Sequence, residues 1–353
     1  MDAKRASEIE SQPTEWLWPG YLAVGNLAIL DGDPDQGKSM LTLDLAARLS
    51  AGRAWPDGLA VETPAPVVLL CAEDPEKLVK ARLRSLGADM ERVFVWPRFE
   101  RGGLPLLPSE VARVESDVKE SGAKLVVIDP IIAFLDRSIQ VVSDADVRRA
   151  LYPLAALAQK YGCVILMVRH LNKRSGINAL YRGGGSIGII ASCRLAWLAG
   201  RDPKTSDRYI LAQAKNNFAP RQASLAYTLP KDGPRVEWQG SSTWSADDLS
   251  QRRRRRAARD RAKAFLLAFL AAGPRTAGEV WRAAVSESFS AHTLRIAKTE
   301  LGIRSQIIPG KGKAMTYWLL DDQVLPAEIS IHPEVDLRVQ ELRKEWGERT
   351  PLD

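Results

Sequence analysis

The stretch that most constrains the fold of this 353-residue chain runs from residue 27 to residue 51. It opens with a short apolar run, 27–30, typical of a buried strand, and closes with an amphipathic segment, 40–50, typical of a helix. The loop before that helix fits G-x-x-x-x-G-K-[ST]: Gly32, Asp33, Pro34, Asp35, Gln36, Gly37, Lys38 and Ser39. Strand, loop and helix in this order predict a phosphate-binding loop (P-loop). Many such loops have glycine in place of Asp35, whose carboxylate is expected to weaken nucleotide binding.

Each residue type in the P-loop has a physical reason. Gly32 and Gly37 allow backbone angles and a close approach to a ligand that a Cβ would block. The helix after Gly37 points its partial positive end at the phosphates, Lys38 reaches the β and γ oxygens, and Ser39 binds Mg²⁺. With Met40 at the start of the helix, residues 32–40 are the expected nucleotide-binding residues. The expected cofactors are ATP and Mg²⁺.

Length and composition bound the class of protein. A chain of 353 residues with 45% hydrophobic content supports one full α/β domain and a second small one. The sequence has no apolar run of eighteen residues, and its first twelve residues are charged and polar. We therefore expect a cytoplasmic protein without a signal peptide or a membrane partner.

Apolar strands and helices alternate along the chain. After the P-loop, strands are predicted at 67–72, 93–96, 124–129 and 163–168, and helices at 75–87, 109–121 and 145–161. These near-continuous apolar strands predict a parallel sheet covered by helices on both faces. Strands at 194–198 and 209–214 and a hairpin of 223–227 with 235–238 are predicted to complete the domain.

Polar residues stand at the ends of three predicted strands. Asp129 follows four apolar residues, the Walker B arrangement of a carboxylate that holds Mg²⁺. Glu73 ends the neighbouring strand, where a carboxylate can orient and deprotonate an attacking water, and Asp74 is the alternative base. The other interpretation of Glu73 is a charge that stabilises the start of the next helix. His170 ends the fifth strand and is expected to face the γ-phosphate.

Ordered motifs extend over about residues 14–230: Trp-Leu-Trp-Pro-Gly, Gly-Asp-Pro-x-x-Gly-Lys-Ser, Cys-Ala-Glu-Asp-Pro, Val-Val-Ile-Asp-Pro, Arg-His-Leu-Asn-Lys and Tyr-Arg-Gly-Gly-Gly-Ser. In this order they resemble the RepA-like branch of RecA-fold ATPases, ring-forming replication helicases of plasmids, phages and integrated elements. The resemblance implies a homo-hexamer with ATP bound between subunits. It also implies that Glu73 is the water-activating base, Asp129 the metal carboxylate and His170 the γ-phosphate sensor linked to DNA-facing loops.

Related ring helicases often place a Lys and an Arg after a late strand, so that both reach into the neighbouring subunit's site. Lys215 matches the first, but Asn217 stands where the Arg is expected. Because an Arg finger contributes orders of magnitude to turnover, hydrolysis is expected to be slow unless another Arg substitutes. The sequence leaves four candidates open: Arg182, Arg194, Arg201 and Arg208.

The net charge of +7 is concentrated late in the chain. Residues 250–320 carry 15 Lys and Arg against 4 Asp and Glu, whereas residues 1–249 carry 31 against 30. The run Arg252–Arg256 is either a solvated linker or, as its basic helical continuation favours, a contact with a nucleic-acid backbone. Helices at 277–285 and 290–300, followed by two short strands joined through a Gly/Lys-rich turn, predict a winged helix whose second helix reads DNA. The side chains available to a DNA groove are His292, Thr293, Arg295 and Lys298 on that helix, with Lys311 and Lys313 on the wing.

We therefore predict an α/β fold with a RecA-like P-loop NTPase core, a parallel-rich sheet and a small C-terminal winged-helix domain. The predicted parts are an ATPase domain (1–240), a basic linker (241–256), the winged helix (257–320) and an acidic tail (321–353). The predicted function is an ATP-hydrolysing DNA helicase or translocase in plasmid or mobile-element replication, acting on single-stranded or duplex DNA with other replication proteins. The alternative is an ATP-dependent DNA-binding regulator or replication accessory protein that uses nucleotide as an assembly ligand.

Overall fold

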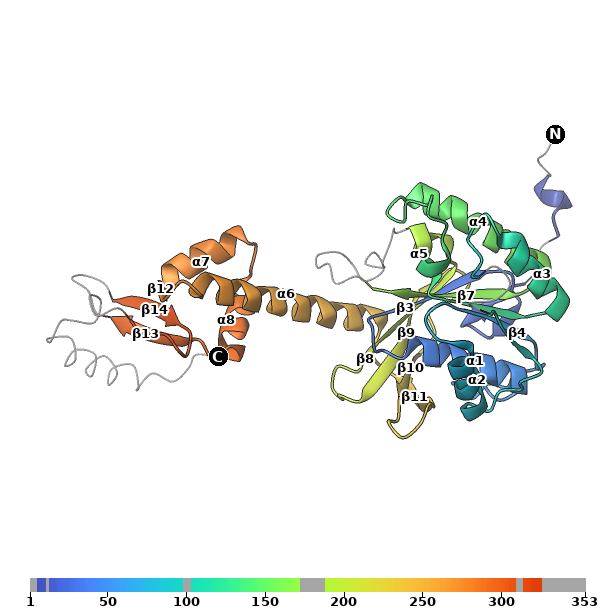
Figure 1. Ribbon diagram of the computed structural model, residues 1–353, viewed down its shortest axis with the longest axis horizontal. Coiled ribbons are helices and arrows are strands. Elements are labelled where there is room, and N and C mark those ends of the chain that lie inside the picture. Colours follow the sequence, from blue (N-terminus) through green and yellow to red (C-terminus); the bar gives the residue numbers. More distant parts are fainter. Residues whose placement is uncertain (1–4, 11–12, 98–102, 172–187, 309–313, 326–353) are drawn as a thin grey trace. The chain divides into compact units, whose positions relative to one another are not determined.

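The computed structural model describes residues 5–10, 13–97, 103–171, 188–308 and 314–325, without the side chains of 251–257. The chain divides into a larger unit, Met1–Arg252, and a smaller unit, Arg253–Asp353. Figure 1 shows helices packed around a large sheet in the larger unit, and helices beside a small sheet in the smaller one. Each unit has an apolar core of its own.

Nine strands form the sheet of the larger unit, in the order β11-β10-β9-β8-β3-β7-β6-β4-β5. Their bounds are β3 Leu27–Gly32, β4 Val67–Cys71, β5 Val93–Val95, β6 Leu125–Asp129, β7 Val164–His170, β8 Leu195–Arg201, β9 Arg208–Asn216, β10 Ser224–Thr228 and β11 Glu237–Ser242. Neighbours from β8 to β5 pair in parallel, and β9, β10 and β11 are added antiparallel. The predicted α/β fold with a parallel-rich sheet is confirmed.

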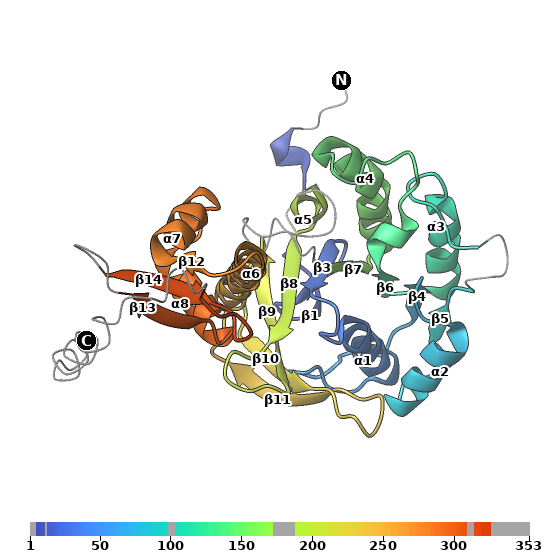
Figure 2. The same cartoon turned by 60° about the vertical axis from the view of Figure 1, so that its left-hand side comes forward.

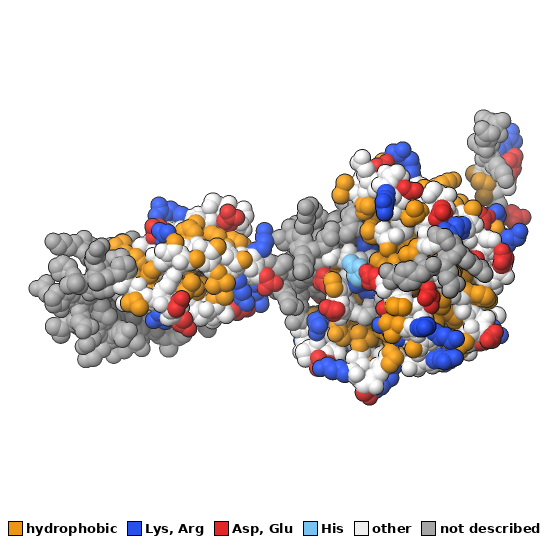
Figure 3. All heavy atoms as spheres, in the orientation of Figure 1, with side chains coloured by type: hydrophobic (Ala, Val, Ile, Leu, Met, Phe, Trp, Pro, Cys, Tyr) orange, Lys and Arg blue, Asp and Glu red, His pale blue; other side chains and the backbone are white. Residues whose placement is uncertain are grey.

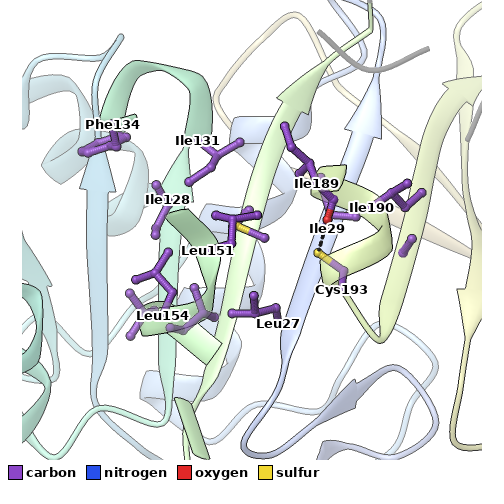
Figure 4. Close-up of a cluster of buried hydrophobic side chains, with 14 of the residues drawn as sticks. Leu27, Ile29, Ile128, Ile131, Phe134, Leu151, Leu154, Ile189, Ile190 and Cys193 are labelled. Atoms are coloured by element: carbon purple, nitrogen blue, oxygen red, sulfur yellow. Dashed lines mark hydrogen bonds between the residues drawn. The ribbon is translucent and has the colours of Figure 1, made fainter. Parts of the chain in front are cut away.

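Alternate side chains of the buried strands pack on opposite faces of the sheet. In β3, Leu27 and Ile29 join one core and Ala28 and Leu30 join the other. The first core also contains side chains of α3 (Val111–Ser121), α4 (Asp144–Tyr161) and α5 (Gly188–Ser192). The second contains side chains of α1 (Lys38–Ala51) and α2 (Glu76–Ser85). Figure 4 shows β3, α4 and α5 meeting in the first core, which explains why these strands are apolar throughout.

One predicted helix starts later than expected. The prediction placed it at 109–121, but α3 begins at Val111, after Glu110. The Ser109 hydroxyl instead donates to a carboxylate oxygen of Asp136 at 2.9 Å, and a Glu110 carboxylate oxygen accepts from the Leu106 N–H at 2.8 Å. A polar side chain ahead of a helix has competing local partners, and here those partners lie outside the helix. Two short strands near the N-terminus, β1 (Trp16–Trp18) and β2 (Leu22–Ala23), were not predicted.

The smaller unit contains three helices and a three-stranded antiparallel sheet in the order β12-β14-β13. The elements are the second part of α6 (Ala246–Leu270), β12 (Arg275–Thr276), α7 (Ala277–Ser286), α8 (Ala291–Glu300), β13 (Arg304–Ile308) and β14 (Met315–Leu319). Capping residues set both internal helix starts: the Thr276 hydroxyl accepts from the Glu279 N–H, and the Ser290 hydroxyl accepts from the Thr293 N–H. The predicted helices and the two long strands are confirmed. The two-residue β12 was missed because so short a run carries no periodicity.

The segment 241–256, predicted as a linker, is largely regular structure. It contains the end of β11, a short turn and the first part of α6, and the boundary between the two units lies inside that helix. Ala246 and Leu249, three residues apart on one helix face, are buried in the larger unit's core. The predicted acidic tail lies outside the described residues from 326 onward. In the described parts of the chain, no helix is long and apolar enough to cross a membrane.

Candidate active site

The carboxyl end of the parallel strands gathers the residues predicted for catalysis. Gly32 at the end of β3 pairs with His170 at the end of β7, and Cys71 at the end of β4 pairs with Asp129 at the end of β6. Glu73 follows β4 by two residues, so it lies at the same end of the sheet as Asp129. Figure 2 shows β3, β7, β6 and β4 in sequence across the sheet. Ligands of open α/β sheets bind at this end.

The backbone of the P-loop explains its residue types. Gly37 has φ +70°, and a Cβ there would lie 2.3 Å from Cδ1 of Leu229. A Cβ on Gly32 would lie 2.8 Å from the carbonyl oxygen of Ala199. Both positions therefore need glycine. Asp35 has φ +61°, the left-handed conformation that glycine adopts most easily, which accounts for the glycine that many such loops carry here.

The remaining loop residues differ in exposure. Pro34 and Asp35 are exposed, Gln36 is buried, and Ser39 and Met40 are half-buried. Because Asp35 is exposed, its carboxylate pays no desolvation penalty in the folded protein. The weaker nucleotide binding expected from this carboxylate stays a prediction.

Lys38 is the first residue of α1, and its side chain is buried, with 4% of the residue exposed. Its Nζ donates to the carbonyl oxygen of Asp33 at 2.7 Å, across the P-loop. Burial lowers the pKa of the Lys38 ammonium, and the nearby carboxylates of Asp129 and Asp33 oppose that effect. A phosphate group would supply the anionic partner that a buried ammonium needs.

Asp129 and Ser39 form the candidate metal site. Asp129 is buried at the end of β6 and has a side-chain hydrogen bond with Ser39. Burial raises the pKa of the Asp129 carboxyl, the Ser39 hydrogen bond lowers it, and the charge of Glu73 adds to the rise. The Oδ1 atom of Asp129 is buried without a hydrogen-bond partner in the described structure.

These two oxygen ligands fit Mg²⁺. No group of three or more His, Cys, Asp or Glu side chains able to hold a metal occurs within the described ranges. Mg²⁺ typically uses one or two protein oxygens and completes its shell with substrate phosphates and water. The unpartnered Asp129 oxygen beside the Ser39 hydroxyl is the arrangement that such an ion would satisfy.

Glu73 and His170 lie together at this end of the sheet. The Nε2 atom of His170 is 3.5 Å from Oε1 of Glu73, and the Glu73 side chain is 61% exposed. The other ring nitrogen of His170, Nδ1, is buried without a hydrogen-bond partner in the described structure. Figure 3 shows a histidine side chain at the surface of the larger unit with acidic side chains beside it. The exposed Glu73 carboxylate can reach a water molecule. His170, at the end of β7, links this carboxylate to the strand beside β3.

Asp74, the alternative base, is engaged elsewhere. Its carboxylate forms an ion pair and a short hydrogen bond with the Arg82 guanidinium of α2. The Asp74 carboxylate is thereby directed toward α2, whereas the exposed Glu73 carboxylate lies beside His170 at the end of β7.

Sequence reasoning missed a buried ion pair next to the P-loop. Asp31 of β3 faces Arg169 of β7, with Nε to Oδ1 at 2.8 Å and Nη2 to Oδ2 at 2.6 Å. The Arg169 side chain is fully buried and that of Asp31 is 5% exposed. This ion pair links β3 to β7 directly before Gly32 and His170, the last residues of the two strands. A charged residue inside each of two otherwise apolar strands was the signal that could have revealed the pair.

Lys215 is not brought to the P-loop of its own chain. It lies near the end of β9, and its Nζ donates to the carbonyl oxygens of Cys193 at 2.6 Å and Ile190 at 3.1 Å, at the end of α5. Burial lowers the pKa of Lys215, and the neighbouring Arg194 and Arg148 lower it further. These three cations are called the cationic cluster below.

The four candidate finger arginines have different surroundings. Arg201 lies over the Tyr209 ring at 5.3 Å, and Arg208 has its Nε 3.6 Å from Asp202. Arg194 is exposed, and its side chain has no hydrogen-bond or ion-pair partner among the described residues. Its backbone N–H donates to the Leu27 carbonyl at the start of β3. Arg182, with the predicted loop 181–186, lies outside the described residues.

Comparison with known proteins agrees with this geometry. Residues 2–176, just under half of the chain, match the family model described as an AAA domain. Together with the sheet and the P-loop, this match supports a RecA-fold ATPase core. The DNA repair protein RadA of Halalkalibacterium halodurans is 27% identical over 160 residues, which cover 45% of this chain and 30% of that protein. The chain therefore aligns with less than a third of that relative's length, and the alignment supports a RecA-fold core without extending to the whole relative.

Proposed function

We propose that the RecA-fold core binds MgATP at the carboxyl end of its sheet and hydrolyses it. The observation that carries the proposal is the gathering of Lys38, Ser39, Asp129, Glu73 and His170 at that end. Lys38 binds the β- and γ-phosphates, and Ser39 and Asp129 hold Mg²⁺, which neutralises charge on the phosphate oxygens when bound. These roles rest on the P-loop pattern and on the buried Oδ1 atom of Asp129, which has no hydrogen-bond partner in the described structure.

Glu73 is the proposed base. Its exposed carboxylate accepts a proton from water as the water oxygen bonds to the γ-phosphorus and the bond to the ADP oxygen breaks. The products are ADP and inorganic phosphate. His170, beside Glu73 and paired in register with Gly32, is the proposed sensor of the γ-phosphate. The ion pair between Asp31 and Arg169, the residues directly before Gly32 and His170, holds β3 and β7 together at this point.

The cationic cluster is the proposed contribution to a neighbouring subunit. The Leu27 carbonyl that accepts from Arg194 lies five residues before Gly32, about 16 Å along the strand. Arg194 is thus far from its own P-loop, exposed, and without an anionic partner among the described residues. We propose Arg194 as the finger in trans, with Lys215 beside it, in a homo-hexameric ring. A site completed by a second copy would account for three cations gathered at one place.

The smaller unit is the proposed DNA-binding part, a winged helix whose recognition helix is α8. On that helix His292 and Arg295 are exposed, and the Arg295 side chain has no partner among the described residues. Lys298, also predicted to reach DNA, instead donates to the Ser305 hydroxyl and lies 4.4 Å from the Trp318 ring centre. Arg259 and Lys263 of α6 pair with Glu300. The described part of the unit therefore offers fewer free cations than its net charge indicates.

The remaining basic residues complete the proposed surface. Lys311 and Lys313, predicted on the wing, lie outside the described residues, as do the side chains of Arg252–Arg256. If these arginines contact phosphates, replacing all five with Ser will weaken binding on every DNA sequence. It will also reduce the salt dependence, by up to about four units of log–log slope. An unchanged slope would make them a solvated segment.

The proposed role is that of a RepA-like helicase or translocase in replication of a plasmid or mobile element. Two measurements separate it from an ATP-dependent DNA-binding regulator: ATP turnover with and without single-stranded DNA, and displacement of a labelled strand. A motor hydrolyses ATP faster with DNA and displaces the strand, and Glu73→Gln abolishes both activities. A protein that binds one duplex site in the presence of ATP, with no stimulated turnover and no displacement, is the regulator.

A further inference from the structure

The β10–β11 hairpin contacts the P-loop although it lies almost 200 residues later in the chain. The Tyr227 hydroxyl, on β10, donates to the carbonyl oxygen of Gln36 at 2.7 Å. Tyr227 is fully buried, and burial raises the pKa of its phenol far above the ordinary value, so it remains a hydrogen-bond donor throughout the physiological range. The protonated phenol holds one particular peptide group of the P-loop, that of the Gln36 carbonyl.

Packing holds the Tyr227 ring in place. It stacks on Tyr209 of β9 with ring centres 5.4 Å apart, and Trp238 of β11 lies on it at 5.5 Å. The Trp238 Nε1 donates to a carboxylate oxygen of Asp44 in α1 at 2.8 Å. Just after β10, Leu229 fills the space beside Gly37. Three side chains of the hairpin thus contact the P-loop and the helix that follows it.

The direction of the Tyr227 hydrogen bond has a chemical consequence. In a trans peptide the C=O and the N–H point in opposite directions, and the bond between Gln36 and Gly37 is trans. A hydroxyl that holds the Gln36 carbonyl toward β10 therefore turns the Gly37 N–H away from β10. The N–H groups of a P-loop are the groups that wrap phosphates.

We propose that Tyr227 is a positioning residue for nucleotide binding, because its hydroxyl aims the Gly37 N–H at the β-phosphate. The inference rests on the MgATP site of the proposed function. Since ATP, ADP and the transition state all carry that phosphate, the hydrogen bond stabilises them equally. Its loss raises KM and the Kd of ADP and leaves kcat unchanged.

The test compares Tyr227→Phe with Tyr209→Phe. Both substitutions remove one hydroxyl from the same aromatic stack, but the Tyr209 hydroxyl has no hydrogen-bond partner in the described structure. MgADP affinity is measured by titration calorimetry, KM and kcat by ATP turnover, and folding by thermal unfolding of the full chain. We expect Tyr227→Phe to raise the Kd of MgADP and the KM of ATP about 2- to 10-fold, with kcat at the parental value, and Tyr209→Phe to change neither.

The possible failures are distinguishable. If the parent binds MgADP and Tyr227→Phe binds it equally well, the inference fails and the proposed function stands, even if the variant unfolds at a lower temperature. An equal loss of affinity in both variants also contradicts the inference, because it would assign the effect to ring packing. If the parent itself binds no MgADP, the proposed function fails and the inference fails with it.

Discussion

Two regions of the larger unit have opposite electrostatic character. At the carboxyl end of the parallel strands, Asp33, Glu73 and Asp129 surround a single buried lysine, Lys38. Around α5, burial lowers the pKa of Lys215, and the like charges of Arg194 and Arg148 in the cationic cluster lower it further. The first region has more carboxylates than cations and would attract a metal ion, whereas the second is positively charged and would attract an anion.

The difference between the two regions suggests how the proposed ATP site of one chain could lack a group that a second copy supplies. In the proposed function, the carboxyl-end residues supply ligands for Mg²⁺, a base and one phosphate-binding lysine. Of the candidate finger arginines that the structure describes, Arg201 contacts Tyr209 and Arg208 contacts Asp202. Arg194 has the required chemistry in the other region. In the proposed ring, the two regions belong to neighbouring copies and complement each other.

The largest effect is expected from Arg194→Ala, which tests whether the two regions meet. If Arg194 reaches a neighbour's γ-phosphate, kcat falls by about 10³-fold, while the ADP affinity of the isolated subunit is unchanged. Arg201→Ala is the matched control, because it removes the arginine at the last position of β8, whereas Arg194 directly precedes that strand. If Arg194→Ala and the parent hydrolyse ATP at the same rate, Arg194 does not act at a neighbouring subunit's site.

A mixing experiment sharpens the same comparison. Arg194→Ala and Glu73→Gln subunits are each inactive alone, but a mixed ring contains interfaces that pair an intact Arg194 with an intact Glu73. Turnover should therefore recover in mixtures of the two. No recovery in rings shown to exchange subunits would place Arg194 outside the neighbouring site.

Lys38→Ala tests the carboxyl end alone and should have the next largest effect. The loss of one charge-assisted phosphate contact raises the Kd of MgADP about 10- to 100-fold, because such bonds contribute about 1.5–3 kcal/mol. Lys160→Ala is the control, since that lysine is exposed on α4 and paired with Glu115. Equilibrium titration distinguishes the two variants, and parental affinity in Lys38→Ala would contradict the P-loop assignment.

Asp129→Asn should have the smallest effect, on stability. Burial raises the pKa of this carboxyl in the folded protein, so its favourable contribution exists below its ordinary pKa and is lost as pH rises through the raised value. At neutral pH the ionised group opposes folding. Without nucleotide, Asp129→Asn should therefore be more stable at pH 7 by about 0.5–2 kcal/mol, with a smaller gain near pH 4.

The matched control for this prediction is Asp136→Asn. The half-buried Asp136 has its pKa lowered by hydrogen bonds from Ser138 and Ser109, so the ionised form favours folding above its ordinary pKa. Removing that charge should not stabilise the protein at pH 7. Denaturant unfolding at both pH values measures the difference, and a lower stability of Asp129→Asn at pH 7 would contradict the account.

Local sequence rules predicted most of the larger unit because its signals are strong and short in range. The apolar runs around Ile29 and Val127 identify strands buried on both faces, and Gly32 and Gly37 identify the loop. Strand ends then placed Asp129, Glu73 and His170 correctly at one end of the sheet. These inferences needed only the rule that parallel strands share a carboxyl end.

What the sequence could not provide depends on contacts between distant segments. Nothing local in Tyr227 indicates that its hydroxyl meets Gln36, and Lys298 reads as a DNA contact until Trp318 is found beneath it. The linker prediction at 241–256 followed local composition, whereas α6 begins at Ala246 and its Leu249 side chain is buried in the larger unit's core. Tertiary packing overrides composition at each of these places.

The central claim, that the carboxyl end of the sheet is a MgATP-hydrolysing site with Glu73 as base, is tested most directly by Glu73→Gln. The amide keeps the shape of the side chain but cannot accept the proton of water. We expect MgATP affinity to stay at the parental value while turnover falls about 10²- to 10⁴-fold, and Asp74→Asn to retain most activity. ATP hydrolysis by Glu73→Gln at the parental rate would contradict the account.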